Sequence, residues 1–173
     1  YGVGTSKAVR IYRTYGNEAI SKVSENPYRL SLDIHGIGFK TADIIAQKLG
    51  IPSDSMIRAR AGVRHVLQEQ SGLGHCACER VELEETAANL LGIETELAGT
   101  ALDAEADEGN LVKDQIEDKD VFYLRSLHRA EIGVADSLAR LSKGESAWSG
   151  VEVDKAIPWV ESKNSITLSQ SQK

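Results

Sequence analysis

The sequence predicts a mainly α-helical fold, in which a duplicated helical hairpin is followed by an α+β part with a small β-hairpin. A match of the chain to itself at an offset of 34 residues predicts the duplication. Apolar residues at helical spacing predict most later elements, and two short alternating runs predict the β-hairpin. No stretch approaches the roughly 20 apolar residues that span a bilayer, so we expect a cytoplasmic protein without membrane contact.

The duplication lies in residues 1–53, which we expect to form one domain. Gly2 to Gly16 (GVGTSKAVRIYRTYG) aligns with Gly36 to Gly50 (GIGFKTADIIAQKLG). In each copy two glycines flank an apolar residue, and an amphipathic helix that ends at a glycine follows. Val3 and Ile37 are expected to hold each turn in the core. Small and apolar positions in the two helices also coincide, namely Ala8 with Ala42 and Ile11 with Ile45.

The glycine turns suggest a phosphate-binding site. Glycines leave the backbone of a turn uncovered, so amide N–H groups at the start of the next helix can bind a phosphate, helped by the helix dipole. Such a site is blind to base sequence. The alternative is that both turns are only tight connections between helices. The candidate contacts in the two copies are Gly2, Gly4, Lys7, Gly36, Gly38, Lys40 and Thr41.

The distribution of charge supports an anionic partner for the N-terminal part. The whole chain has a formal charge of -6, but residues 1–65 carry ten Lys and Arg against five Asp and Glu, which is +5. The remainder is therefore -6 minus 5, or -11. Such an asymmetry is expected when one part of a protein meets nucleic acid and the other does not.

These residues carry a family resemblance. The run from Gly36 to Ala42 (GIGFKTA) resembles the helix-hairpin-helix motif of DNA repair and recombination proteins, and the duplication resembles its tandem form. Lys40 stands where that family often has a phosphate-contacting lysine. The runs Asn26 to Leu30, His35 to Asp43 and Arg58 to Gly62 are similar to the N-terminal region of RecD/TraA-type DNA helicases, the exodeoxyribonuclease V alpha-subunit-like proteins.

This second resemblance has implications for residues 151–173, which we expect to lead into a helicase motor domain. The run Leu168 to Gln172 resembles the segment that precedes the nucleotide-binding loop in those motors, so Gln172 would contact adenine in a parent helicase. No G-x-x-x-x-G-K-[ST] loop is present. We therefore expect this chain to be a piece of a longer protein that lacks cofactors and ATPase activity itself, whereas the parent would use ATP and Mg²⁺.

Residues 54–124 are expected to form a helix followed by a winged-helix-like part. A helix at 54–70 with Asp54 as N-cap precedes a strand at 75–78, helices near 81–91 and 94–108, and a hairpin of 111–114 with 121–124. The last helix before the wing often reads the major groove in such modules. Here residues 81–109 hold nine acids and no Lys or Arg, so a structural or protein-docking wing is the better interpretation.

Two arginines of the helix at 54–70 are further candidates. Arg60 and Arg64 are one helical turn apart, and we expect them to share an exposed face. They either bind a phosphate beside the hairpins or are ordinary solvated surface charges.

Metal and nucleophilic sites find no support in the sequence. His75, Cys76 and Cys78 lack the further ligands that structural zinc needs, and reduced thiols are the expected state of both cysteines. His35 and His65 have no partner in a recognisable triad order, so we expect no catalytic residues. A helix at 124–141 and then a Gly/Ser-bearing linker are expected to make up the region 125–150. Trp159 is expected to pack against the motor domain.

Together these features predict sequence-independent binding of DNA backbone, on single strands or at a fork, by the accessory N-terminal part of an ATP-dependent DNA helicase of DNA repair or recombination. The alternative is a protein-interaction module that docks the motor domain or a repair partner. A basic surface around both hairpins favours DNA, whereas a large apolar patch on the acidic half favours the partner.

Overall fold

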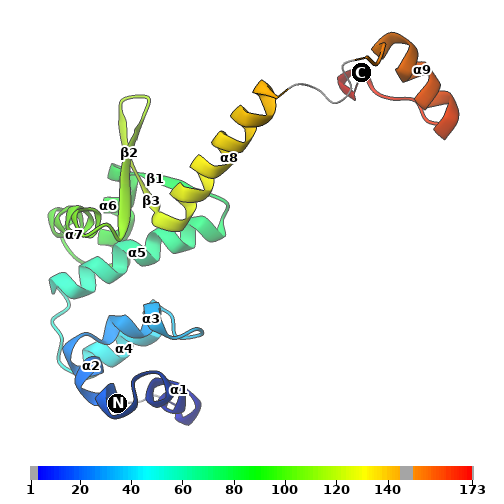
Figure 1. Ribbon diagram of the computed structural model, residues 1–173. Helices are drawn as coiled ribbons and strands as arrows, with labels where there is room; N and C mark the ends of the chain where they lie inside the picture. The colour runs from blue at the N-terminus through cyan, green and yellow to red at the C-terminus, as the bar shows by residue number, and fades with distance from the viewer. Residues whose placement is uncertain (1–3, 145–149, 173) are drawn as a thin grey trace. The chain divides into compact units, whose positions relative to one another are not determined.

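The computed structural model describes residues 4–144 and 150–172. The chain divides into two compact units, Tyr1–Ile132 and Gly133–Lys173 (Figure 1). The first unit contains the duplicated hairpins and the α+β part, and the second contains the remainder of a long helix and the C-terminal segment. Gly2 and Val3, which belong to the first predicted turn, lie outside the described residues.

The N-terminal part of the first unit is helical throughout, as the sequence predicts. Its elements are α1 (Thr5–Tyr15), η1 (Gly16–Glu18), α2 (Ala19–Glu25), η2 (Pro27–Arg29), α3 (Leu30–Asp33) and α4 (Phe39–Lys48). The repeat is visible in the backbone, because α1 and α4 begin 34 residues apart and the aligned glycines Gly16 and Gly50 have φ values of 56° and 79°. The predicted helix-ending glycines are therefore confirmed.

The core of this part forms around the second hairpin. Ile37 is 2% exposed and packs with Leu30, Ile34 and Ile45, so its predicted place in the core is confirmed. The two alanines differ: Ala42 of α4 is fully buried, but Ala8 of α1 is exposed. The reason is that Tyr28 of η2 and residues of the following helix cover the Ala42 face. No described segment covers the Ala8 face in the same way.

The α+β part follows in the order helix, strand, two helices and hairpin. Its elements are α5 (Met56–Gly72), β1 (Ala77–Glu79), α6 (Arg80–Leu91), α7 (Thr95–Asp107), β2 (Leu111–Ile116) and β3 (Lys119–Leu124). The three strands form an antiparallel sheet in the order β1-β3-β2, with Cys78 opposite Phe122. Apolar side chains of α5, α6, α7 and the sheet make the core. Asp54 is not the N-cap of α5, because the helix begins after Ser55.

The β-hairpin is tighter than expected. The strands extend to Ile116 and Lys119, which leaves Glu117 and Asp118 as the turn, with φ values of 48° and 66°. Two consecutive left-handed residues are characteristic of a type I′ turn, whose usual signal is Asn-Gly. The Glu-Asp pair does not carry that signal, and the sequence therefore predicted a longer loop.

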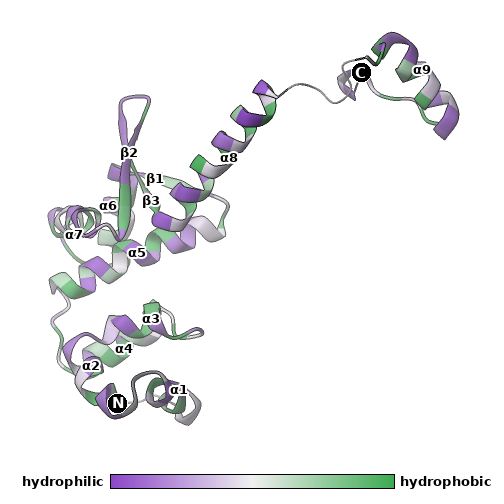
Figure 2. Ribbon diagram, in the orientation of Figure 1, coloured by the Kyte–Doolittle hydropathy of each residue, from purple (hydrophilic) through white to green (hydrophobic). Residues whose placement is uncertain are grey.

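The C-terminal segments are helical. They are α8 (Arg125–Lys143), α9 (Val153–Asn164) and the single turn η3 (Gln170–Gln172). Hydrophobic and hydrophilic residues alternate around α8 (Figure 2). Trp159 of α9 is 65% exposed. The expected linker falls largely on residues 145–149, outside the described part. Among the described helices none is long and apolar enough to cross a membrane.

Candidate nucleic-acid interface

A side-chain hydrogen bond joins the first turns of α1 and α4. Lys7 Nζ donates a hydrogen bond to Thr41 Oγ1 at 3.1 Å. Lys7 and Thr41 occupy the same position in the two copies, since 7 plus 34 is 41. A contact between equivalent positions is the hallmark of a two-fold arrangement. The structure therefore brings two of the predicted site residues, Lys7 and Thr41, into contact between the first turns of the two helices.

A second contact ties the two copies together. Arg10 NH1 donates a hydrogen bond to the carbonyl oxygen of His35 at 3.3 Å, in the turn that precedes α4. Arg10 belongs to the second turn of α1, and sequence reasoning did not single it out. Its only signal was a positive charge on the helix face one turn after Lys7.

Both helix starts are open to an anion. Gly4 and Gly38 are the N-cap residues, and neither helix has a side-chain cap among the residues described. A Cβ atom added at either glycine would meet no atom within 4 Å. The carbonyls of Gly4 and Gly38 each accept bonds from two later amides, in α1 and α4 respectively. Uncapped N-termini with open space above them carry partial positive charge, which suits a phosphate.

The two glycines of the second hairpin have different roles. Gly36 has φ of 84°, a left-handed conformation that favours glycine, and a Cβ there would lie 2.8 Å from Arg10 NH1. Gly38 has φ of -90° and ψ of 176°, which any residue can adopt. Gly36 is therefore needed for the shape of the turn, and Gly38 for free access to the helix start.

Lys40 is the exposed cation of the second hairpin, and no acidic partner for it is found in the described parts of the chain. Its position is fixed by Phe39, which is 6% exposed. The Phe39 ring stacks on Tyr28 with 5.8 Å between centroids, and on His65 of α5 with 4.9 Å. Burial lowers the pKa of His65, and Lys40 adds to that effect. The α4 start is thus held rigidly while its lysine reaches solvent.

Arg58 joins the hairpins to the α+β part, and sequence reasoning missed this role. Its guanidinium donates to Asp43 Oδ1 at 2.9 Å and Oδ2 at 3.2 Å, and to the carbonyl oxygens of Ser53 and Leu91, both at 2.8 Å. Arg58 is 8% exposed. The hydroxyl of Tyr28 also donates to Asp43, and burial together with this bond raises the pKa of Tyr28. One side chain therefore connects α4, α5 and the end of α6.

Arg60 and Arg64 do not share the exposed face that the sequence predicted. Arg60 Nε donates to Glu105 Oε1 at 2.6 Å, and Arg64 NH1 donates to Glu105 Oε2 at 2.7 Å. Glu105 is fully buried, and the arginine side chains are 23% and 16% exposed. Glu108 also pairs with Arg60. The expectation failed because the acids that meet this face come from α7, about 45 residues later in the chain.

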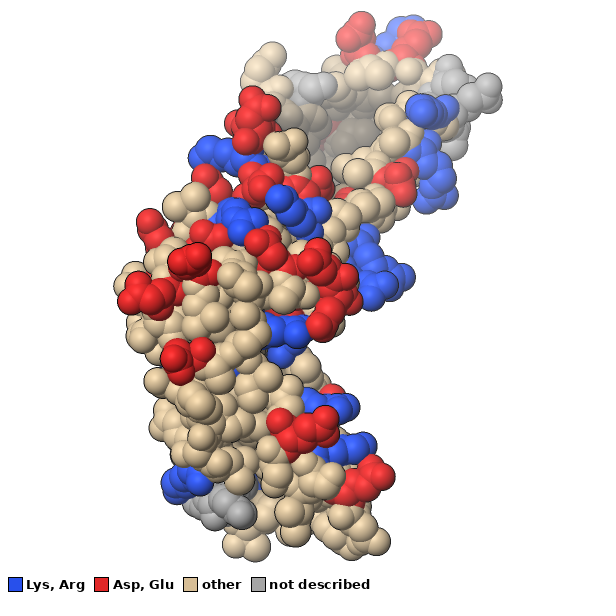
Figure 3. Space-filling model, turned by 90° about the vertical axis from the view of Figure 1, so that its left-hand side faces the viewer, with Lys and Arg blue, Asp and Glu red and all other residues tan. Residues whose placement is uncertain are grey.

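The charged surface is consistent with these pairings. Figure 3 shows acidic side chains gathered on the side of α6 and α7, while the N-terminal part below them carries scattered charges on a mostly uncharged face. Arg80 also pairs internally, with Glu84 at 2.7 Å and Asp103 at 2.8 Å. On the face that Figure 3 shows, no continuous basic patch surrounds the hairpins.

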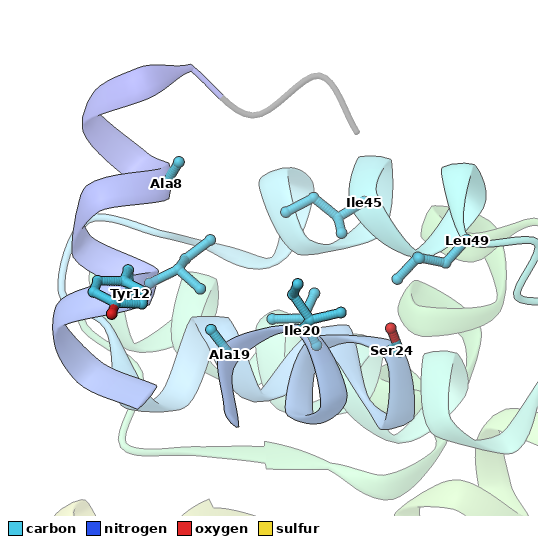
Figure 4. Close-up of a pocket in the computed structure, with 9 residues that line it drawn as sticks. Ala8, Tyr12, Ala19, Ile20, Ser24, Ile45 and Leu49 are labelled. Carbon is cyan, nitrogen blue, oxygen red and sulfur yellow. The ribbon is translucent and has the colours of Figure 1, made fainter. Parts of the chain in front are cut away.

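An apolar pocket opens beside the first hairpin. It has a volume of about 300 Å³ and lies between α1, α2 and α4 (Figure 4). Ile20 and Tyr12, which line it, are 79% and 60% exposed. The sequence analysis named an apolar patch on the acidic half as the sign of a protein partner, whereas this pocket lies on the half that contains the hairpins.

The remaining candidates are unremarkable in their surroundings. Gln172 Oε1 accepts hydrogen bonds from the amide and hydroxyl of Ser169, within the terminal turn. Cys76 is exposed, and Cys78 is buried, which raises the pKa of its thiol to about 11. Across residues 4–144 and 150–172, no group of three or more His, Cys, Asp or Glu is placed to hold a metal ion.

The N-terminal part thus defines a class: a tandem helix-hairpin-helix domain in which Lys7 in the first turn of α1 bonds to Thr41 in the first turn of α4. Residues 1–77 match the family model described as "ATP-dependent RecD2 DNA helicase HHH domain". The match ends at the first residue of β1, so it covers both hairpins and α5. The resemblance to the N-terminal region of RecD-type helicases is confirmed for this stretch, which is similar to the HHH domain of RecD2-type helicases.

Proposed function

We propose that this chain binds DNA backbone through its paired hairpins, as the accessory N-terminal part of an ATP-dependent DNA helicase. The observation that supports the proposal most strongly is the Lys7–Thr41 contact, which links the first turns of two helices that lack a side-chain cap. Two such sites can take two phosphates of one bound DNA. Contacts of this kind position a protein on DNA without reading bases. The family match of residues 1–77 supports the same function.

In the parent helicase this domain would hold DNA on single strands or at the fork, while the motor domain consumes ATP with Mg²⁺. The motor supplies the phosphate-binding loop, and Gln172 would contact adenine there. Among the hairpin residues, Gly4, Gly38, Lys40 and Thr41 offer backbone or side-chain donors, Lys7 bridges the two copies, and Gly36 shapes the turn.

The α+β part is proposed to be a winged-helix-like module that supports the hairpins and contacts protein instead of DNA. Its order of elements is that of a winged helix, with β2 and β3 as the wing. Its last helix before the wing, α7, carries acids that DNA would repel.

One observation favours the alternative of a protein-interaction module. The apolar pocket between α1, α2 and α4 exposes Ile20 and Tyr12 to solvent, and exposed apolar patches often mark protein contacts. Under this alternative the motor domain or a repair partner would occupy the pocket, and the hairpins would be structural.

A titration separates the two functions. Affinity for single-stranded, duplex and forked DNA is measured by fluorescence anisotropy at several salt concentrations. The comparison includes the parent chain, Lys40→Glu, Lys48→Glu and Ile20→Asp. Lys48 is a matched control, since it is an exposed lysine at the opposite end of α4. For three to five phosphate contacts, log affinity should fall with log salt with a slope of roughly -3 to -4.

Lys40→Glu should weaken binding roughly tenfold and make the slope shallower by about one. Lys48→Glu should act only through the general field, and Ile20→Asp should leave DNA affinity unchanged. Equal effects of Lys40→Glu and Lys48→Glu, in chains that melt normally, would remove Lys40 from the site. If the unmodified chain binds none of the three DNA forms, the protein-interaction function becomes the better supported of the two.

A further inference from the structure

A groove of about 390 Å³ lies between the second hairpin and the end of α7. Three arginines from two elements line it: Arg29 of η2, and Arg60 and Arg64 of α5. The facing wall carries two glutamates, Glu105 and Glu108. The formal charge of these five side chains is +3 minus 2, or +1.

The two glutamates differ in burial and in role. Glu105 is fully buried and accepts hydrogen bonds from Arg60 Nε and Arg64 NH1, at 2.6 and 2.7 Å. It therefore fixes both guanidinium groups in place. Glu108 has a side chain that is 56% exposed, and it binds the outer edge of Arg60. Its Oε1 accepts from Arg60 NH1 at 2.8 Å, and its Oε2 accepts from Arg60 NH2.

The Glu108 carboxylate sits in the guanidinium fork in a bidentate manner. The two oxygens of a carboxylate and two oxygens of a phosphate fit this fork with the same geometry, so each can replace the other. Water screens this pair only in part, because the Glu108 side chain is 56% exposed but that of Arg60 is 23% exposed, and the hydrogen bonds from Arg60 lower the pKa of Glu108. Glu108 also lies at the C-terminal end of α7, where a negative charge opposes the helix dipole. The carboxylate is thus a solvent-exposed occupant of an anion site, and a phosphate would have to displace it.

Two residues that line the groove are close in sequence to the second hairpin or to a residue that contacts it. Leu32, another lining residue, comes directly before Asp33, the last residue of α3, and the hairpin turn follows. Arg64 directly precedes His65, whose ring stacks on Phe39 at the start of α4. A DNA strand that reaches Lys40 is therefore close to the groove.

We infer that this groove is a second phosphate-binding site for DNA held at the hairpins, and that Glu108 competes with the phosphodiester for Arg60. The inference rests on the proposed function. In the unmodified chain Glu108 occupies part of the site. Its removal leaves the Arg60 guanidinium, which the buried Glu105 already holds in position, able to bind a phosphate.

The test is Glu108→Gln, with Glu85→Gln as its control. Glu85 is an exposed acid of α6 with the same charge and no hydrogen bond or ion pair within the described parts of the chain. DNA affinity is measured by anisotropy across a salt series, and melting temperature checks the fold of each variant. Glu108→Gln should bind at least threefold more tightly than Glu85→Gln, with a salt slope steeper by about one. Adding Arg29→Gln to Glu108→Gln should cancel much of that gain, and Arg29 is half exposed, so folding is not at stake.

The outcomes separate this inference from the proposed function. If Lys40→Glu weakens binding but Glu108→Gln behaves like Glu85→Gln, the hairpins bind DNA and the groove does not. If the parent chain binds no DNA, the proposed function fails and the groove inference fails with it. If millimolar inorganic phosphate raises the melting temperature of Glu108→Gln while its DNA salt slope matches that of Glu85→Gln, the groove takes free phosphate, and a DNA site there is refuted.

Discussion

Replacing Glu105 with glutamine should destabilise the first unit strongly, although the two residues have nearly the same volume. Each carboxylate oxygen accepts from a different arginine, at 2.6 and 2.7 Å. A glutamine offers one oxygen, and its NH₂ group would face the donors of the other guanidinium. Breaking a buried ion pair by removing one partner costs about 3–5 kcal/mol. Small domains have a free energy of unfolding of only about 5–15 kcal/mol, so the loss is a large fraction.

Urea unfolding followed by circular dichroism measures the effect. Glu108→Gln is the control, because it removes the exposed partner of the same arginine and should leave the midpoint close to that of the parent. A Glu105→Gln chain that unfolds within about 1 kcal/mol of the parent would refute the view that Glu105 anchors both arginines. The same reasoning predicts that Glu105→Lys would also destabilise the first unit, because it would place a third cation against two partly buried ones.

Further predictions concern stability. Gly36→Ala should cost about 1–2 kcal/mol, because its φ of 84° is left-handed, whereas Gly38→Ala should stay within about 0.5 kcal/mol of the parent in urea unfolding and lower only DNA affinity. Equal stability losses at the two positions would contradict these distinct roles. Burial lowers the pKa of His65 in the folded chain. The free energy of unfolding is therefore highest above the pKa of an unfolded histidine, near 6.5, and it declines as the pH falls from there to the lower pKa of the folded chain. His65→Gln should flatten this part of the stability–pH profile, while His75→Gln, at an exposed position, should not. Arg58→Lys should lose about 2–3 kcal/mol, because lysine cannot satisfy Asp43 and two carbonyl oxygens at once; thermal melting within a degree of the parent would count against it.

The hairpins could be predicted because their determinants are local. Two glycines, an apolar residue between them and a helix with a terminal glycine all lie within 15 residues, and the second copy repeats the pattern. The element order of the α+β part was predictable for the same reason, since each helix and strand follows its own periodicity. The positions of Lys40 and Ile37 followed from this local plan, one exposed and the other buried.

The contacts between elements were beyond the reach of local patterns. Arg60 and Arg64 looked like a solvated pair because their carboxylate partner, Glu105, is more than 40 residues away and sits in a run of acids. Nothing in that run marks Glu105 as the buried member. Arg58 was likewise counted as free positive charge, although Asp43 neutralises it. The difference in role between Gly36 and Gly38 depends on backbone angles that the letter G does not specify.

The pairings change what the charge asymmetry means. Of the ten Lys and Arg in residues 1–65, five have a carboxylate within 4.0 Å in the described structure: Lys22, Arg29, Arg58, Arg60 and Arg64. The other five all lie in residues 1–53, where the hairpins are: Lys7, Arg10, Arg13, Lys40 and Lys48. The three arginines of α5 are therefore paired with Asp43, Glu105 and Glu108, and only Arg60 would lose a partner if Glu108 moved away. The chain carries ten further Lys and Arg after residue 65, so these five cations set the salt slope only if the hairpins alone contact DNA; the limit is then about -4.5, since each neutralised phosphate contributes about -0.9. A measured slope steeper than this limit would mean that cations outside this group of five also bind DNA, and a slope that Glu108→Gln does not steepen further would show that the groove adds no contact.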